Sequence, residues 1–185
     1  MGGHAAAPGN AVQLDLLARL LDAAARQAMP LWLGGGWAID ARLGRITRAH
    51  VDIDLTFPGE RRDEFVELIG ALGAVITEET DYGFLADCHG VLLDCEPARW
   101  TGSAYELDGT PPGSCPDALE GTLGGLPLRC NSWVAIAWDY LHYAEEQPQS
   151  QWPARHVLSY GLVRSALGNA EVERLHALFN ASRTD

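Results

Sequence analysis

The chain has 185 residues, of which 47% are hydrophobic and 21% charged, so it can bury a core in one compact domain or two small ones. This composition excludes a fibrous or disordered protein. Thirteen basic against 25 acidic residues give a net charge of −12, which repels nucleic-acid phosphates and attracts polycationic small molecules. All 13 basic residues are arginine, so a Schiff-base lysine or a P-loop lysine is excluded.

Neither a membrane span nor a secretory leader is predicted. No stretch approaches the roughly 18 to 20 apolar residues of a transmembrane helix, and residues 1–10 lack a basic start and an apolar run. We therefore expect a soluble, cytoplasmic protein that acts as a monomer and binds neither membranes nor nucleic acid. The four cysteines lack metal-binding spacing, so we expect reduced, mostly buried thiols rather than a zinc site.

The first hundred residues alternate between helix and strand patterns. A triple glycine, residues 34–36, joins the first strand to a short helix. In chain order we expect a helix capped by Asn10 and ending near Met29, a strand over 31–33, a helix over 37–43, a strand over 50–57, a helix over 60–72, and strands over 74–77, 84–88 and 91–96.

The second half has a different composition. Residues 97–125 are rich in Gly, Pro, Ser and Thr, which predicts an irregular segment, followed by a short strand over 126–130. The remainder predicts three helices, over 131–146, 153–167 and 169–180. We therefore expect an α/β domain over 1–100, a linking segment over 101–130 and a helical domain over 131–185, with a cleft between the two domains for two substrates.

Asp52 and Asp54 stand two residues apart in one predicted strand. Because side chains alternate along a strand, both carboxylates share one face, while Val51, Ile53 and Leu55 face the core. Two like charges at that spacing repel each other unless a cation bridges them, and Mg²⁺ prefers such oxygen ligands. The alternative is that both residues face water on an edge strand.

A second acidic pair, Asp94 and Glu96, lies in the apolar strand over 91–96. If this strand pairs beside that of Asp52 and Asp54, four carboxylates converge from neighbouring strands. Such a surface binds metal and accepts a proton, as phosphoryl or nucleotidyl transfer requires. Taken singly, Asp94 and Glu96 would more often be solvated strand residues.

The triple glycine would let backbone N–H groups and a helix N-terminus approach a phosphate chain. No Gly-Lys-Ser/Thr follows, so the turn is not a P-loop, and a triple glycine alone is more often a plain turn. Arg48 and Arg155 are candidates to bind a triphosphate, although each could equally be a solvated surface residue. His50 is expected to orient the Asp52 strand or to bond a phosphate rather than to act as a base.

Together these motifs resemble the aminoglycoside nucleotidyltransferases of the DNA polymerase β superfamily, most closely the aminoglycoside 2''-nucleotidyltransferase type. The resemblance covers almost the whole chain apart from the first dozen residues and the last helical turn. It implies an α/β (α+β) fold, in which a polymerase β-like domain with a small mixed sheet flanked by helices precedes a C-terminal helical bundle. It rests on residues 31–45, 47–48, 50, 52–57, 81–85, 93–97, 113–116, 129–133 and 138–140.

The resemblance also implies a reaction. AMP would pass from ATP to a hydroxyl of an aminoglycoside of the kanamycin, gentamicin or tobramycin type, at the 2'' position, releasing pyrophosphate and giving antibiotic resistance. Gly35 and Gly36 would hold the triphosphate, and Asp52 and Asp54 would bind one or two Mg²⁺ ions. Asp94 would act as the general base and would also touch a metal ion.

For the antibiotic, the resemblance implies contacts of its ammonium groups with Glu96 and Asp139, with Tyr82 nearby. Three positions depart from the family pattern: Val51 stands where another acid is expected, which should leave metal binding intact, and two others leave the acceptor range open. His142 stands near the antibiotic where an aromatic hydroxyl is expected, and Arg155 stands near the phosphates where a lysine is expected.

Two other functions fit parts of the sequence. One is a nucleotidyltransferase of the same fold that acts on a lincosamide or another small hydroxyl acceptor, whose binding would depend less on salt than that of a polycation. The other is a non-catalytic nucleotide-binding module. The presence of all three aspartates together with the glycine turn argues against the second.

Overall fold

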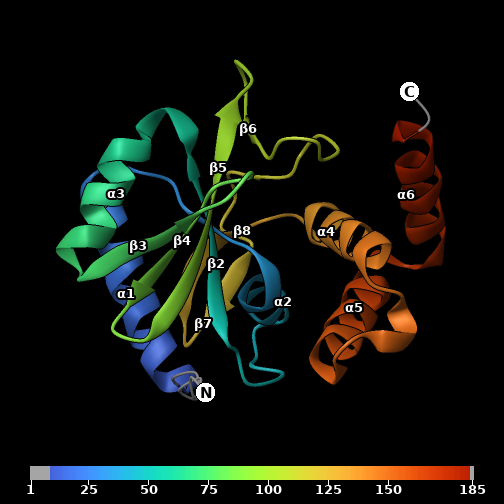
Figure 1. Ribbon diagram of the computed structural model, residues 1–185, viewed down its shortest axis with the longest axis horizontal. Helices are drawn as coiled ribbons and strands as arrows, with labels where there is room; N and C mark the ends of the chain where they lie inside the picture. The colour runs from blue at the N-terminus through green and yellow to red at the C-terminus, as the bar shows by residue number, and fades with distance from the viewer. Residues whose placement is uncertain (1–8, 184–185) are drawn as a thin grey trace.

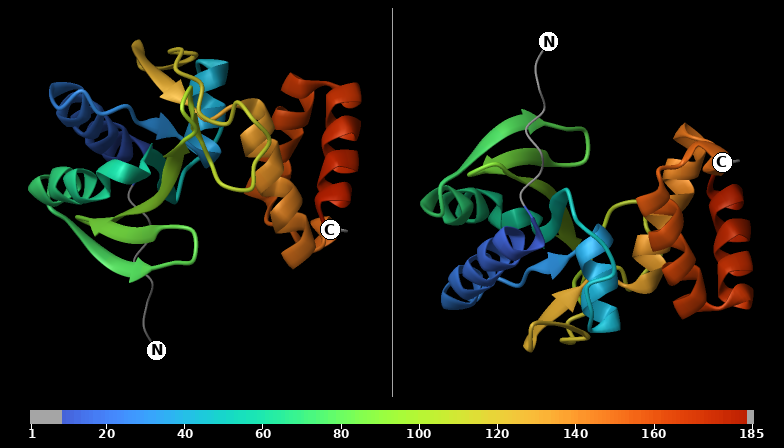
Figure 2. Two further views of the ribbon diagram at one scale, coloured as in Figure 1. Left: turned by 90° about the horizontal axis from the view of Figure 1, so that it is seen from above. Right: turned by 90° about the horizontal axis from the view of Figure 1, so that it is seen from below.

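The computed structural model describes residues 9–183 and consists of a mixed sheet, helices packed on it, and a group of helices beside it (Figure 1). Within these residues seven strands follow the order β3-β4-β5-β2-β1-β8-β7, and an eighth, β6, pairs with β5. Helices α1 and α3 pack together on one side of the sheet, whereas α4, α5 and α6 stand apart as a group in all three views (Figures 1 and 2). The predicted fold class is confirmed.

The centre of the sheet is formed by two parallel strands, β2 and β5, with β1 antiparallel to β2 and parallel to β8. A hairpin with its turn at residues 88–91 joins β4 to β5. The strands are β1 (Trp32–Leu33), β2 (Asp52–Pro58), β3 (Ala74–Glu79), β4 (Phe84–Cys88), β5 (Val91–Trp100), β6 (Tyr105–Glu106), β7 (Gly121–Leu123) and β8 (Leu126–Cys130).

Six α-helices complete the fold, with 3₁₀ turns at Gly59–Arg61 and Gln149–Gln151. Ser132 caps α4, because its hydroxyl accepts a hydrogen bond from the Ala135 N–H at 3.1 Å. None of the helices within residues 9–183 has the length and apolar character of a membrane span. The helices are α1 (Asn10–Arg26), α2 (Gly35–Leu43), α3 (Arg62–Ala71), α4 (Trp133–Glu146), α5 (Ala154–Leu167) and α6 (Asn169–Ser182).

The main core lies between the sheet and helices α1 and α3. Phe57 of β2 stacks on Phe65 of α3 with ring centroids 4.3 Å apart, and burying each such ring stabilises the fold by about 1.5–3 kcal/mol. Ile53 of β2 and Leu93 of β5 are fully buried in the same core. Because side chains alternate, this burial directs the intervening acidic side chains to the opposite face of the sheet.

The segment over 97–125 is more regular than predicted. Strand β5 continues through Pro97 to Trp100, and β6 pairs with its end. Strands β7 and β8 form a hairpin whose turn uses the positive φ angles of Gly124 and Gly125, and β8 pairs with β1. Part of the segment 101–130 therefore belongs to the sheet. Strands of two or three residues are too short to show alternation, and Pro97 interrupted the pattern of β5.

Three smaller expectations are also corrected. Gly9 occupies the N-cap position of α1, and the Asn10 carboxamide instead donates to the Arg48 carbonyl at 2.8 Å and accepts from the His50 N–H at 2.9 Å. Helix α1 ends at Arg26, before Met29. Val51 is 41% exposed rather than buried, because β2 begins only at the next residue, Asp52. The four cysteines are buried free thiols, as expected.

Candidate active site

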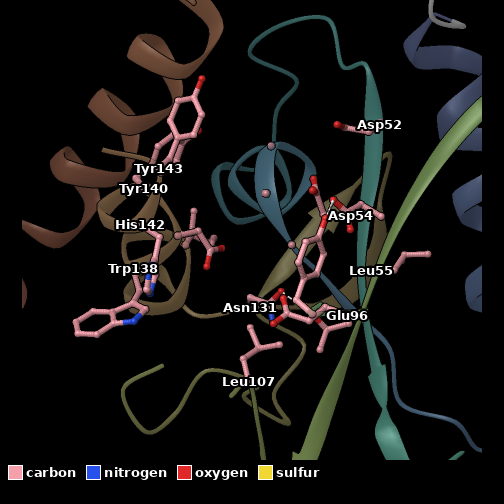
Figure 3. A pocket seen from close by; sticks show the side chains of 18 of the residues that line it. Asp52, Asp54, Leu55, Glu96, Leu107, Asn131, Trp138, Tyr140, His142 and Tyr143 are labelled. Atoms are coloured by element: carbon pink, nitrogen blue, oxygen red, sulfur yellow. Dashed lines mark hydrogen bonds between the residues drawn. The ribbon is translucent and has the colours of Figure 1, made fainter. Parts of the chain in front are cut away.

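A cleft of about 740 Å³ lies between the sheet and helices α4 and α5 (Figure 3). One side, the sheet wall, is formed by Asp52 and Asp54 of β2 and by Asp94 and Glu96 of β5. The other side, the helical wall, is formed by residues of α4 and α5. Eight carboxylates line the cleft against two arginines, Arg48 and Arg155; the eight are Asp52, Asp54, Asp81, Asp94, Glu96, Asp108, Asp139 and Glu146.

The sheet wall brings the predicted acids together. Asp54 and Asp94 are Cα partners on parallel strands, so their side chains share a face, and Glu96 stands opposite Thr56. Figure 3 shows Asp52 and Asp54 projecting from β2 toward the helices. The expectation that the two acidic strands are neighbours is confirmed, and the edge-strand alternative for Asp52 and Asp54 is wrong, because β2 lies inside the sheet.

Crowding of carboxylates controls the electrostatics of the sheet wall. Burial raises the pKa of Asp54 well above its usual range, and repulsion from Asp52 and Asp94 adds to the effect. Burial also raises the pKa of Asp94, although a hydrogen bond from the Tyr82 hydroxyl, at 3.2 Å, lowers it in part. Glu96 is raised to a pKa of about 7 by burial and by Asp94. The sheet wall is therefore an unfavourable place for negative charge until a cation arrives.

This donor set fits a magnesium ion that is shared with a substrate. No three His, Cys, Asp or Glu side chains in the described part of the chain are gathered into a complete metal site. Mg²⁺ at nucleotide sites usually takes one or two carboxylates and completes its shell with phosphate oxygens and water. Asp52 and Asp54, whose charges repel each other next to the glycine turn, meet that requirement.

The glycine turn allows close approach to these carboxylates. Helix α2 begins at Gly35, two residues before its predicted start. Gly35 has a φ of +45°, and a Cβ atom there would overlap the Asp54 carboxylate, while a Cβ on Gly36 would overlap the Arg48 guanidinium. Glycine is therefore required at both positions. The first N–H groups of α2 lie beside Asp54, where a phosphate chain can be bound.

His50 lies behind the glycine turn and does not line the cleft. Its Nε2 is 2.7 Å from Asp40 Oδ2, both side chains are buried, and its ring stacks on Trp37 at 4.0 Å. Burial alone would raise the pKa of Asp40, but hydrogen bonds from His50 and Thr47 lower it. The structure fits the expected orienting role of His50. Direct bonding to a phosphate, the other expectation, is not supported, because the ring is enclosed.

The helical wall places Asp139 and His142 of α4 at the cleft, as predicted, together with Arg155 of α5. Asp139 is exposed to the cleft, and partial desolvation by the surrounding walls raises its pKa to about 8, with further repulsion from Glu96 and Asp94. No charged partner is positioned to neutralise it among the described residues. This carboxylate suits a cationic ligand.

Sequence reasoning missed several residues that line the cleft. Asp139, His142, Tyr143 and Glu146 follow helical i, i+3, i+4, i+7 spacing, so the polar stripe of α4 is a signal that could have identified the last two. The others gave no such signal; they are Tyr140 of α4, His156 of α5, and Asp81, Leu107, Asp108, Thr110 and Asn131 outside the helices.

Carboxylates in register beside a glycine turn are the arrangement that metal-assisted nucleotidyl transfer needs, and the fold places this chain among the nucleotidyltransferases. The chain belongs to the aminoglycoside 2''-adenylyltransferase family, whose model matches residues 16–150. It is therefore an enzyme, an aminoglycoside nucleotidyltransferase. The family resemblance drawn from the sequence motifs is confirmed.

The similarity extends over nearly the full length of the relatives. A 2''-aminoglycoside nucleotidyltransferase of Klebsiella pneumoniae is 56% identical over 169 residues, covering 91% of this chain and 96% of the relative. One from Escherichia coli is 55% identical with the same coverage. The crystal structure of ANT(2'')-Ia in complex with adenylyl-2''-tobramycin matches with a TM-score of 0.92 and 54% identity, covering 93% of this chain and 99% of that one. The lincomycin-bound lincosamide adenylyltransferase LnuA shares the fold, with a TM-score of 0.62 and 17% identity.

Proposed function

We propose that this enzyme transfers AMP from MgATP to the 2'' hydroxyl of an aminoglycoside of the kanamycin, gentamicin or tobramycin type, releasing pyrophosphate. The observation that carries the proposal is the pairing of Asp54 with Asp94 on adjacent strands, facing a cleft lined by eight carboxylates. The 54% identical relative bound to adenylyl-2''-tobramycin supports the same acceptor class and position.

In the proposed reaction the acceptor oxygen forms a bond to the α-phosphorus of ATP, and the bond between the α-phosphorus and the bridging oxygen of pyrophosphate breaks. Asp94 takes the proton that the acceptor hydroxyl loses. Burial strengthens Asp94 as a base by raising its pKa. Tyr82, which donates to Asp94 at 3.2 Å, marks the carboxylate oxygen that a donor group can reach.

Asp52 and Asp54 would hold the magnesium ion, which when bound supplies charge neutralisation to the phosphates. Gly35 and Gly36 leave room for the triphosphate at the N-terminus of α2. The guanidinium groups of Arg48 and Arg155, the two arginines that line the cleft, would then bind phosphate oxygens.

Recognition of the acceptor follows from charge. An aminoglycoside carries several ammonium groups, and Glu96 and Asp139, whose charges are destabilised in the free cleft, gain most when a cation binds. Tyr82 and His142 lie at the same cleft and complete the proposed acceptor contacts. Since one chain supplies both walls, we propose that it works as a monomer, in the cytoplasm where ATP is available.

The test is incubation of the purified protein with MgATP and a panel of aminoglycosides plus lincomycin. Pyrophosphate release and mass spectrometry of each antibiotic are followed. We expect a gain of one AMP on tobramycin or kanamycin, at the 2'' oxygen, and none on lincomycin. We also expect the KM for the aminoglycoside to rise with salt, because the attraction is between opposite charges. AMP transfer to lincomycin alone, or to no acceptor, would contradict the proposal.

A further inference from the structure

One hydrogen bond joins the loop before β2 to the helical wall of the cleft. Arg48 lies in the loop between α2 and β2, yet its Nε donates to the hydroxyl of Ser159, on α5, at 3.0 Å. Its Nη1 donates to the Ala49 carbonyl at 2.9 Å, and its Nη2 lies against Gly36 of the glycine turn. The guanidinium is therefore held between the turn and the helical wall.

The backbone of this loop is fixed separately by α1. Asn10 bonds the Arg48 carbonyl and the His50 N–H, and the Gln13 carboxamide donates to the His50 carbonyl at 2.9 Å. With the backbone fixed in this way, the remaining freedom of Arg48 lies in its long side chain. Ser159 restricts that freedom from the helical side, because it bonds the nitrogen where the guanidinium begins.

The Ser159 side chain is buried inside the helical wall. It is 1% exposed, and it lies close enough to the Tyr140 hydroxyl, which lines the cleft from α4, to lower the pKa of that phenol in part against the effect of burial. Because Ser159 accepts from Arg48, its own proton is available for Tyr140. The Tyr140 ring is in turn packed against Trp152 and Tyr160, with centroids 5.6 and 5.2 Å away.

We propose that Ser159 is a positioning residue for the nucleotide: it holds Arg48 beside the glycine turn so that the guanidinium meets the triphosphate without a search of side-chain conformations. This inference rests on the proposed function, which places the triphosphate at that turn. Preorganisation of this kind increases affinity by lowering the ordering cost of binding. Loss of the Ser159 hydroxyl should weaken nucleotide binding, whereas the carboxylates of β5 and α4 that bind the acceptor keep their positions.

The test compares Ser159→Ala with Ser159→Thr, which keeps a hydroxyl, and with Ser165→Ala, an exposed serine on the same helix. Affinity for the magnesium complex of a non-hydrolysable ATP analogue is measured by calorimetry, and KM is measured for MgATP and for tobramycin. For Ser159→Ala we expect the nucleotide affinity to fall and the KM for MgATP to rise by about three- to tenfold, as for loss of one hydrogen bond. The tobramycin KM should change less than about twofold.

A merely structural role is separated by two further measurements. Ser159→Thr should restore most of the nucleotide affinity, and thermal unfolding reports whether each variant is folded. In a double-mutant cycle with Arg48→Gln, the effect of Ser159→Ala should largely disappear, because Ser159 acts through Arg48.

Equal losses for both substrates, or full additivity with Arg48→Gln, would overturn the inference. So would an unchanged nucleotide affinity in a folded Ser159→Ala variant. None of these results would affect the proposed reaction, which fails only if the unmodified enzyme does not transfer AMP from MgATP.

Discussion

The two walls of the cleft are built on different principles. On the sheet wall, Asp54 and Asp94 are fixed by strand pairing, and a core of stacked phenylalanine rings lies on the other face of the same strands. On the helical wall, Asp139 and Tyr140 project from α4, a helix held mainly by side-chain packing. The hydrogen bond from Arg48 to Ser159 joins this wall to the loop that precedes β2. We infer that the sheet wall provides the chemistry, which requires fixed distances, and that the helical wall provides recognition together with Glu96 at the edge of the sheet wall.

Both walls share an excess of negative charge. Burial and mutual repulsion raise the pKa values of Asp54, Asp94, Glu96 and Asp139 together. In the free enzyme this charge opposes folding, and binding of cations relieves it. The same residues thus reduce stability and attract both proposed ligands, a metal–nucleotide complex and a polycationic antibiotic.

The largest expected effect is that of Asp94→Asn on the sheet wall. The amide cannot accept the acceptor proton, so kcat should fall by about 10²- to 10⁴-fold. Binding of the MgATP analogue should persist, because Asp52 and Asp54 remain. The rate is measured by mass spectrometry of AMP-tobramycin in reactions quenched at successive times. The control is Asp63→Asn, a substitution at an exposed position of α3. Normal turnover of a folded Asp94→Asn variant would show that Asp94 is not the base.

Gly35→Ala should be nearly as harmful, although it adds a single methyl group. The new Cβ would overlap the Asp54 carboxylate, and the φ of +45° is unfavourable for alanine. We expect turnover to fall by about 10²-fold or more as Asp54 is displaced, with a loss of about 1–3 kcal/mol of stability. The matched control is Gly70→Ala in α3, where a Cβ meets nothing within 4 Å and should stabilise the helix. Equal effects of the two substitutions would contradict the close packing of the turn.

On the helical wall, Asp139→Asn should change recognition rather than rate. Loss of one charge toward the ammonium groups should raise the aminoglycoside KM by about tenfold, with kcat within a few-fold of the original. The salt dependence of that KM should also become weaker. Steady-state kinetics at two ionic strengths test this, with MgATP KM as the internal control. A large fall in kcat with an unchanged KM would assign Asp139 to the chemical step.

The same residue predicts a pH dependence of stability. The pKa of Asp139 is raised from 3.8 to about 8, so the folded state binds its proton more tightly than the unfolded state does. Stability contributed by this group is therefore lost as pH rises from about 4 to 8. Asp139→Asn should be more stable than the unmodified protein at pH 8 by about 1–2 kcal/mol, after allowance for solvent in the cleft, and equal near pH 4. Urea unfolding without magnesium or nucleotide measures the difference; a gain of the same size at both pH values would contradict it.

The smallest effect is expected for Tyr82→Phe. The Tyr82 hydroxyl donates to Asp94 at 3.2 Å, but the side chain is 47% exposed and the bond is a single one. Loss of that donor should change kcat/KM for the aminoglycoside by about two- to fivefold. The acidic limb of the pH profile of kcat/KM should shift to higher pH, since the hydrogen bond from Tyr82 lowers the pKa of Asp94. A loss comparable to that of Asp94→Asn would mean that Tyr82 itself takes part in proton transfer.

The contrast between the walls also explains which parts were predictable from sequence. The positions of Asp52, Asp54 and Asp94 follow from alternation along two strands, a local rule that single sequences display. Their adjacency required only that two apolar strands pair. The family resemblance then supplied Asp139 and His142, which lie on the polar stripe of α4.

The features that the sequence did not predict depend on contacts between distant segments. Strands β6 and β7 are too short for periodicity, and their pairing is decided by the sheet edge they meet. The burial of His50 against Asp40 and Trp37 reflects how α2 packs beside the loop, which spacing alone does not reveal. Ser159 stands 111 positions from Arg48, so only the folded chain shows that they meet.

The central claim is that Asp94 of the sheet wall carries the chemistry and Asp139 of the helical wall recognises the acceptor. It is tested most directly by measuring kcat and aminoglycoside KM for Asp94→Asn and Asp139→Asn side by side, with MgATP saturating. We predict that Asp94→Asn loses kcat and keeps its KM within a few-fold, whereas Asp139→Asn keeps kcat and loses affinity. The reverse pattern, or an equal loss of kcat in both folded variants, would contradict the account.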